Sequence, residues 1–167
     1  MSMLHEAVAS SRQHPLDLIE QMVEDNGWAY ERAAADEINL SVAGRWTDHH
    51  FSVTWHDDLQ SLHISSAFDM HVLGETRLSD VASLLMYVNA RLWIGHFDLW
   101  PEDGTIVFRH SMIFPESHVS AAQCETMLNL ALEACEHYYP AFQFVLWGGK
   151  TAEEAVAAAI LECAGEA

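Results

Sequence analysis

The stretch that decides the fold runs from Thr76 to Ser111 and reads TRLSDVASLLMYVNARLWIGHFDLWPEDGTIVFRHS. Its first half has apolar residues at the spacing of a buried helical stripe, which predicts a helix from Thr76 to Ile94. The stripe consists of Leu78, Val81, Leu85, Val88 and Leu92. Gly95 follows at the position where a glycine commonly ends a helix. We therefore expect a central helix with one apolar face toward the core.

The second half of the stretch predicts a β-hairpin. Its turn is Pro101-Glu-Asp-Gly104, in which proline fixes φ and glycine accepts a positive φ. The strands are His96–Trp100 and a second one that begins at Thr105. A four-residue turn pairs Trp100 with Thr105, Leu99 with Ile106 and Phe97 with Phe108. The apolar residues of the two strands then share a face, so one face of the hairpin should meet the core.

The flanking chain predicts further helices and strands. Before the central stretch we expect a helix from Pro15 to about Asn26 and strands over 28–33, 38–43, 48–56 and 61–68. The last two strands form a hairpin with Trp55 opposite Leu62 and Val53 opposite Ile64, and a shift of two residues satisfies the same alternation. After it we expect a helix over 120–138 ended by Pro140, an extended segment or strand over 141–147, and a helix from Thr151 to about Cys163.

This order of elements predicts the fold class. Strands joined by hairpins form an antiparallel sheet, and its apolar face has to be covered by the helices. The expected fold is α+β, a two-layer structure with an antiparallel sheet of about five to six strands and helices packed on it. We expect residues 1–13 to be a flexible tail and residues 14–167 to form a single domain.

The composition excludes several classes of function. The 167 residues contain 25 acidic and 7 basic ones, which gives a formal charge of −18. A chain this acidic repels nucleic acid and anionic membrane surfaces, so neither is an expected partner. Apolar runs stay shorter than the ~18 residues of a membrane span, and the N-terminus lacks the pattern of a signal peptide. A cytoplasmic protein is expected. The three cysteines, Cys124, Cys135 and Cys163, are expected to be small buried side chains of helices.

The motifs that usually carry catalysis are incomplete in this sequence. Gly148-Gly-Lys-Thr151 resembles the end of a phosphate-binding loop, but Phe144 occupies the place of the first glycine. Thr151 and Glu154 instead have the spacing of a helix capping box. None of the serines lies in the G-x-S-x-G pattern of a nucleophile elbow. Asp98 and Arg109 are expected to form an ordinary cross-strand ion pair. We therefore expect no enzyme and no cofactor.

Eleven histidines raise the alternative of a small-ligand or metal site. His56 and His63 stand on neighbouring expected strands, and Asp58 lies in the turn between them. These three residues are the candidate metal ligands, although the short spacings typical of zinc sites are missing. The other interpretation is that the histidines lie on the solvated face of the sheet.

The six tryptophans are the remaining unusual feature. Most of them lie near the ends of expected elements, where a side chain either completes the core or is exposed. Exposed aromatic residues that gather together mark a protein interface. Trp93, Trp100 and Trp147 are the candidate residues of such a recognition surface.

Several short strings resemble the YbjN family, which is described as a family of bacterial sensory transduction regulators. The common features are Val88-Asn89, Gly95-His-Phe-Asp98 and Asp103-Gly104 with the apolar strand that follows. More specific strings are Gly44–Trp46, Ala67–Met70, Asn89–Trp100 and Tyr139–Lys150. The resemblance covers residues 14–167.

The resemblance implies a fold similar to the type III secretion chaperones, a curved antiparallel sheet with helices packed against it. Those chaperones are commonly dimers that bind extended segments of other proteins, and the YbjN family brings no catalytic residues with it. The additional C-terminal helix expected here departs from the smallest chaperone pattern. The expected function is therefore a non-enzymatic, chaperone-like regulator with a protein or peptide partner and a possible homodimer, and the alternative is the histidine site described above.

Overall fold

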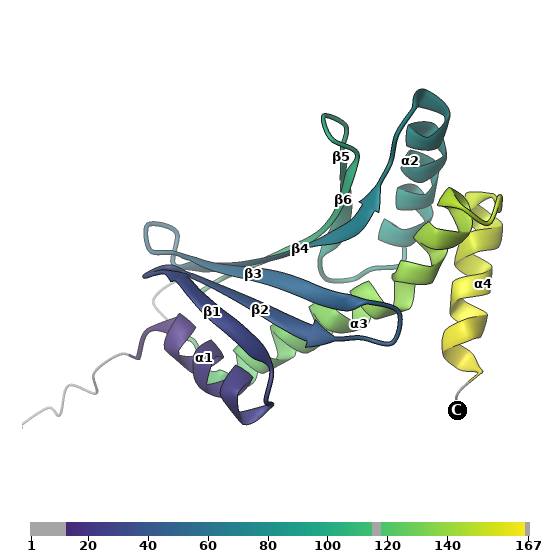
Figure 1. Cartoon of the computed structure of the whole chain (residues 1–167). Coiled ribbons are helices and arrows are strands. Elements are labelled where there is room, and N and C mark those ends of the chain that lie inside the picture. The colour runs from purple at the N-terminus through teal and green to yellow at the C-terminus, as the bar shows by residue number, and fades with distance from the viewer. Residues whose placement is uncertain (1–12, 115–117, 166–167) are drawn as a thin grey trace, which may run out of the picture.

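The structure is a computed structural model that describes residues 13–114 and 118–165. The described part contains six strands and four helices (Figure 1). In chain order they are α1 (Pro15–Asp25), β1 (Ala29–Ala34), β2 (Glu37–Ala43), β3 (Asp48–His56), β4 (Ser61–His71), α2 (Glu75–Asn89), β5 (His96–Trp100), β6 (Thr105–Ile113), α3 (Ala121–Leu146) and α4 (Ala152–Ala164). Except for Gln13, the expected tail of residues 1–13 lies outside the described residues. The predicted α+β class is confirmed.

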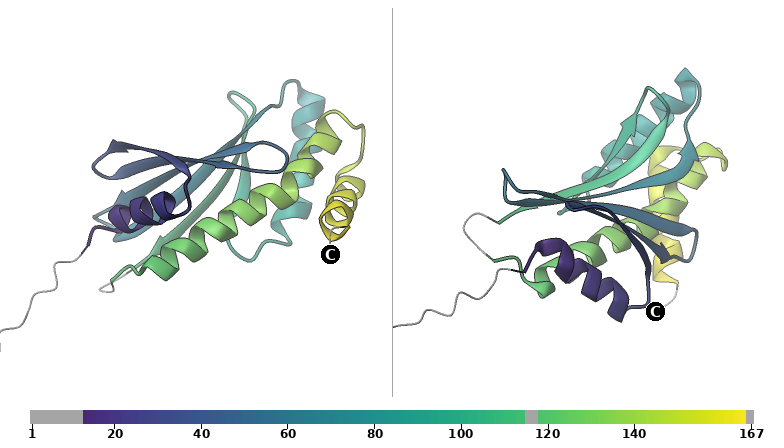
Figure 2. Two further views of the ribbon diagram at one scale, coloured as in Figure 1. Left: turned by 60° about the horizontal axis from the view of Figure 1, so that its bottom comes forward. Right: turned by 60° about the vertical axis from the view of Figure 1, so that its left-hand side comes forward.

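The six strands form one antiparallel sheet in the order β1-β2-β3-β4-β6-β5. Both predicted hairpin registers are confirmed, since Trp55 pairs with Leu62 and Phe97 with Phe108. Strand β4 joins the two halves of the sheet. Its first part, Ser61–Ser66, pairs with both β3 and β6, and its last part pairs with β6 alone across an irregularity in the register. The sheet bends there, so that the β5–β6 hairpin rises from the plane of β1–β3 (Figures 1 and 2).

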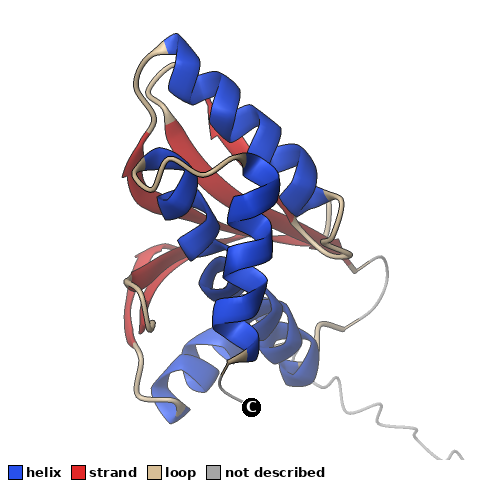
Figure 3. Cartoon of the chain, turned by 90° about the vertical axis from the view of Figure 1, so that its right-hand side faces the viewer, coloured by secondary structure: helices blue, strands red, loops and turns tan. Residues whose placement is uncertain are grey.

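The four helices lie on one side of the bent sheet (Figure 2). Buried and more exposed residues alternate along β2, β3 and β4, so the buried residues share one face of the sheet. The helices cover this face. Helix α3 runs under the sheet, and α4 packs against both α2 and α3 at one end of the molecule (Figure 3). The centre of the core is aromatic: the ring centroid of Phe97 lies 5.5 Å from that of Phe68 and 5.4 Å from that of Phe142.

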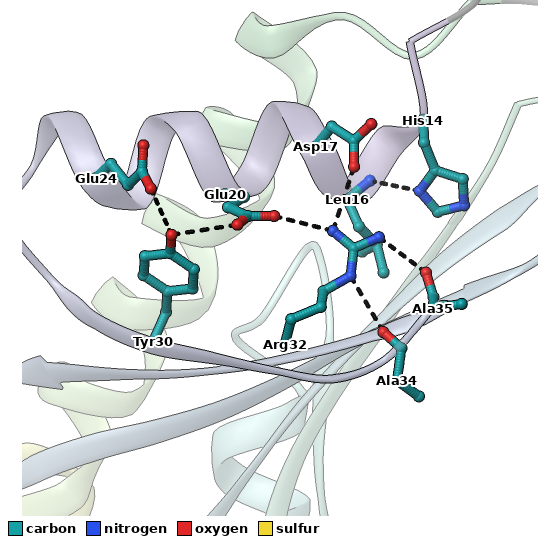
Figure 4. Close-up of polar contacts among 9 residues, drawn as sticks. All are labelled: His14, Leu16, Asp17, Glu20, Glu24, Tyr30, Arg32, Ala34 and Ala35. Atoms are coloured by element: carbon teal, nitrogen blue, oxygen red, sulfur yellow. Dashed lines mark hydrogen bonds and ion pairs between the residues drawn. The ribbon is translucent and has the colours of Figure 1, made fainter.

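Helix α1 is fastened to the edge strand β1 by polar contacts (Figure 4). The guanidinium of Arg32 lies 3.3 Å from the carboxylate of Asp17 and 3.1 Å from that of Glu20. It also donates hydrogen bonds to the carbonyl oxygens of Ala34, the last residue of β1, and of Ala35 in the turn that follows. The hydroxyl of Tyr30 donates to Glu24 and to Glu20. These contacts link α1 to the edge strand β1.

The end of α3 differs from the prediction. Pro140 was expected to end this helix and 141–147 to be extended, but the helix continues to Leu146 with Pro140 inside it. An internal proline costs a helix about 3 kcal/mol because it removes a hydrogen bond and crowds the preceding turn. Pro140 is buried, and the fully buried Phe142 follows it in the aromatic core. Burial of these side chains outweighs the local cost of the proline.

Helix α2 ends earlier than its apolar stripe predicted. The last helical residue is Asn89 rather than Ile94, and residues 90–95 form a turn and bend. Gly95 is therefore not the helix-ending residue. It has φ +74°, and a Cβ atom there would lie 2.4 Å from the ring of Phe108. The glycine is required because the backbone passes directly over this ring.

The expected burial of the cysteines is correct for two of the three. Cys124 and Cys135 are buried in α3, whereas Cys163 is exposed near the end of α4. Burial raises the pKa of the Cys124 thiol to about 11. It also raises the pKa of Cys135 well above its usual range. Both buried thiols therefore stay protonated and behave as small apolar side chains.

Candidate functional site

The side chain of Asn89 caps the outer edge of β5 at Phe97. Its Nδ2 donates to the carbonyl oxygen of Phe97 at 2.9 Å, and the N–H of Phe97 donates to its Oδ1 at 2.8 Å. These are the two contacts that the backbone of a neighbouring strand would make with β5. Asn89, the last residue of α2, thus links the helix to the edge strand by hydrogen bonds. It also fixes the start of the chain segment that connects them.

That connecting segment exposes a group of large apolar side chains. Leu92 turns inward and is half-buried, while Trp93 points outward with 99% of its surface exposed. Met86 is 73% exposed, and Tyr87 and Ile94 are exposed as well. We call Met86, Tyr87, Trp93 and Ile94 the α2–β5 patch. Four large apolar residues exposed within nine positions of sequence exceed the scattered single residues of an ordinary surface.

A groove of about 530 Å³ adjoins the patch. Its walls come from the β2–β3 turn, the α2–β5 connection, the middle of α3 and the end of α4. The aromatic and apolar lining comprises Trp46, Leu92, Trp93, Ile94, Leu130, Ala134 and Tyr138. We call this cavity the α3 groove. Trp93 belongs to both the patch and the groove, so the two form one continuous surface.

The β2–β3 turn is held against α3 by a glutamate. The carboxylate of Glu136 accepts a hydrogen bond from the backbone N–H of Arg45 at 3.1 Å and a second from the ring of His49, which is almost fully buried. A Cβ atom on Gly44 would lie 2.0 Å from a carboxylate oxygen of Glu136. Glycine is needed here because the carboxylate packs directly on the backbone of the turn. This contact positions Arg45 and Trp46 at the groove.

The charged side chains of the groove differ in how they are bound. The guanidinium of Arg45 lies over the ring of Trp46, 4.5 Å from its centroid. Arg91 donates to the carbonyl oxygen of Tyr87 at 2.8 Å. Glu133 is exposed, and no described residue forms a hydrogen bond or ion pair with its carboxylate. Burial lowers the pKa of His137, so this groove residue is neutral at pH 7. Glu133 is therefore the acidic group of the groove that is left for a ligand.

The three tryptophans chosen from the sequence are all exposed, but they do not form one surface. Trp93 follows the end of α2. Trp100 and Trp147, which are 47% and 66% exposed, lie near the start of α2 instead. Arg77 in the first turn of α2 donates to the carbonyl oxygen of Val145, close to Trp147. Helix α2 has 15 residues and is thus about 22 Å long. The structure therefore keeps Trp93 in the candidate site and separates the other two from it.

Sequence reasoning missed several residues of this surface. Met86 and Tyr87 lie off the apolar stripe of α2, and this position was a signal that they face solvent. The apolar stripe of α3 likewise leaves Glu133 on its outer side. Trp46 and Arg45 gave no comparable signal, because only the folded chain brings the β2–β3 turn to α3.

The histidine alternative has no metal geometry in the described residues. Within 13–114 and 118–165, no group of three His, Cys, Asp or Glu side chains is placed to hold a metal ion. His56 pairs with Ser61 and His63 with Thr54, and Asp58 lies in the turn between these strands. The ring of His63 forms a hydrogen bond with Ser111 at 2.8 Å. Burial, followed by the nearby Arg109, lowers the pKa of His63.

The other predicted contacts have structural roles. Thr151 and Glu154 form the predicted capping box of α4, and the hydrogen bonds from Thr151 lower the pKa of the Glu154 carboxyl. Asp98 and Arg109 form the predicted ion pair at 3.2 Å. The Gly148–Thr151 segment is thus accounted for by the start of a helix.

Comparison with known families identifies the chain. A family model described as "YbjN: Putative bacterial sensory transduction regulator" matches residues 15–144. The chain belongs to the YbjN family. A solved structure described as that of "YbjN, a putative transcription regulator from E. coli" is 15% identical to this YbjN-family protein, with a TM-score of 0.49 over 90% of this chain and 91% of that one. No curated protein sequence matches at a significant level.

The family match covers the candidate site only in part. It includes the α2–β5 patch and the α3 residues of the groove, and it ends before α4. Helix α4 contributes Cys163 to the groove, so the C-terminal helix adds a wall that the match does not contain. Among residues 13–114 and 118–165, every helix is too short or too polar to cross a membrane.

Proposed function

We propose that this YbjN-family protein is a non-enzymatic, chaperone-like regulator that acts by binding a partner protein in the cytoplasm. The binding surface is the α2–β5 patch together with the α3 groove. The observation that carries the proposal is the complete exposure of Trp93 at the rim of the groove, beside Met86. Tryptophan, tyrosine, methionine and arginine are the residues enriched at protein interfaces, and all four types occur at this surface.

The site's chemistry supports binding rather than catalysis. The carboxylate of Glu133 is exposed to solvent, whereas catalytic acids and bases usually lie in clefts beside a specific partner group. An apolar groove with a few polar groups at its rim instead fits a segment of a protein chain. Helix α4 forms one wall of the groove and leaves the groove open. The additional helix is thus compatible with binding of a partner.

The test compares two tryptophan variants. The tagged wild-type protein and the variants Trp93→Ala and Trp147→Ala are expressed in the native host, and co-purified proteins are quantified by mass spectrometry. Both substitutions remove an exposed tryptophan, so both variants should fold normally. We expect a partner that the wild type and Trp147→Ala retain equally and that Trp93→Ala loses by about tenfold, as for an interface hot spot. Equal recovery with all three proteins, or recovery of no partner, contradicts the proposal.

A further inference from the structure

We propose that the partner segment carries an apolar side chain next to a lysine or arginine, and that the basic side chain pairs with Glu133 while the apolar one packs on Trp93. This inference names the class of partner and rests on the proposed function. It follows from the distribution of charge in the α3 groove and over the whole chain.

The charged side chains of the groove differ in the contacts that they already make within the protein. Arg45 stacks on Trp46, and Arg91 donates to the carbonyl oxygen of Tyr87. Glu136 accepts hydrogen bonds from His49 and from the backbone of Arg45. Glu133 lies on the same face of α3 and has no such contact among the described residues. The arginines keep their positive charge, but contacts within the protein already hold their guanidinium groups. Glu133 is therefore the charged lining residue whose side chain is left for a ligand, and it is negative.

The long-range electrostatic field of the protein also favours a basic partner. The groove contains two arginines and two glutamates, so its local charge is close to zero, whereas the chain carries −18. A field of this sign raises the association rate of basic partners and lowers that of acidic ones. An acidic segment would be repelled by the rest of the molecule before it reached the arginines. A basic segment is attracted and finds Glu133 at the groove.

The indole of Trp93 is fully exposed, so both faces of its ring are accessible. An indole face binds an ammonium or guanidinium as well as an aliphatic side chain. Tyr138, a further aromatic residue of the groove, is buried, and burial raises the pKa of its hydroxyl, which stays neutral. The groove thus combines aromatic surface with one free carboxylate, the combination that recognises a basic residue beside an apolar one.

The experiment uses three fluorescein-labelled peptides with the same leucine and alanine residues and with lysine, glutamine or glutamate at the polar positions. Binding to the full chain is measured by fluorescence anisotropy at low salt. We expect the lysine peptide to bind about tenfold more tightly than the glutamine peptide, and the glutamate peptide to bind most weakly. Trp93→Ala should weaken binding of the lysine peptide by about tenfold.

Two charge variants locate the effect. Glu133→Gln should weaken the lysine peptide about two- to fivefold, as expected for an exposed charge pair, and leave the glutamine peptide unchanged. Glu153→Gln removes the same charge from the exposed start of α4, outside the groove, and should change neither affinity. If Glu133→Gln and Glu153→Gln have equal effects, the preference for the lysine peptide comes from the net charge of the protein. That result would overturn the role of Glu133.

The remaining outcomes separate this inference from the proposed function. Tight, Trp93-dependent binding of the glutamate peptide overturns the inference and leaves the proposed function standing. Absence of binding by all three peptides also overturns the inference. The co-purification experiment then decides the proposed function independently, because it does not depend on the charge of the partner.

Discussion

The two edge strands of the sheet are each linked to a helix, but by different contacts. At the β1 edge, charged side chains of β1 and α1, such as Arg32 and Glu20, bind each other (Figure 4). At the β5 edge, the neutral side chain of Asn89 makes both contacts to the backbone of Phe97. The β1 edge has a polar surface. The β5 edge leaves Trp93 and Met86 exposed beside a groove.

The comparison bears on the proposed function. Strand β1 is linked to α1 without large apolar side chains being exposed beside it. The apolar side chains exposed at the β5 end are therefore not needed to link an edge strand to a helix. Binding of a partner protein, as proposed above, would account for them. The largest difference between the two edges is expected in stability.

Gly95 and Gly27, which lie in the connections between a helix and an edge strand, should differ most in the cost of substitution by alanine. Gly95→Ala places a Cβ atom 2.4 Å from the ring of Phe108 and forces an alanine into φ +74°, so we expect a loss of about 3 kcal/mol in the free energy of unfolding. Gly27, which connects α1 to β1, has φ +67° and no atom within 4 Å of an added Cβ. Gly27→Ala should cost about 1 kcal/mol, from backbone strain alone. Urea denaturation measures both, and equal losses would show that the α2–β5 connection is not tightly packed.

Removal of the helix-to-edge contacts comes next. Asn89→Ala leaves the N–H and carbonyl oxygen of Phe97 without their partner, at an expected cost of about 2 kcal/mol. Arg32→Gln should cost about 1 kcal/mol, because its ion pairs are partly exposed to solvent. Denaturation in urea at low and high salt distinguishes the loss of ion pairs from the loss of hydrogen bonds between neutral groups. Salt should weaken the effect of Arg32→Gln and leave that of Asn89→Ala unchanged.

The two edges should also respond differently to pH. The hydrogen bond to the Glu24 carboxylate raises the pKa of Tyr30 to about 12. A group whose pKa rises on folding stabilises the fold below its unfolded pKa of about 10 and stops doing so as the pH passes its folded pKa. The contact from Tyr30 to α1 should therefore weaken between about pH 10 and pH 12. Absorbance titration of the wild type and of Tyr30→Phe measures this transition. The difference between the two curves separates Tyr30 from Tyr138, whose pKa burial also raises, and a difference centred near pH 10 contradicts the contact.

The smallest effect on stability is expected at the proposed binding surface. Trp93→Ala removes a side chain that is 99% exposed, so the free energy of unfolding should change by less than about 0.5 kcal/mol. Thermal unfolding checks this expectation, with Trp147→Ala as the matched control. A loss above about 2 kcal/mol would mean that Trp93 packs against the protein, and the α2–β5 patch would then be part of the core.

The sequence predicted the two hairpins well, because two signals complement each other. The alternation of apolar residues limits the register to a few choices, the length of the turn selects one of them, and the structure confirms each pair. The helix ends were harder. Pro140 has the local properties of a helix-ending residue, and only the aromatic core formed by distant strands keeps α3 continuous through it. Leu92 continues the stripe of α2, yet it packs on the core from the turn after the helix.

The candidate site depended even more on the folded chain. Tryptophan composition singled out Trp93, but it singled out Trp100 and Trp147 equally, since sequence alone does not place them at opposite ends of α2. The groove is formed by four segments far apart in sequence, from Arg45 to Cys163. That Glu133 has no partner among the described residues is likewise a property of the fold, because it depends on which neighbours bind the other charged side chains of the groove.

In the proposed function, the surface around Trp93 binds another protein. Site-specific incorporation of a benzophenone amino acid at position 93, followed by irradiation of living cells, tests it most directly. Position 147, also an exposed tryptophan, provides the matched control. We predict a discrete crosslinked protein from position 93 and none from position 147. The absence of a crosslink at position 93, or the same crosslinked proteins from both positions, would contradict the account.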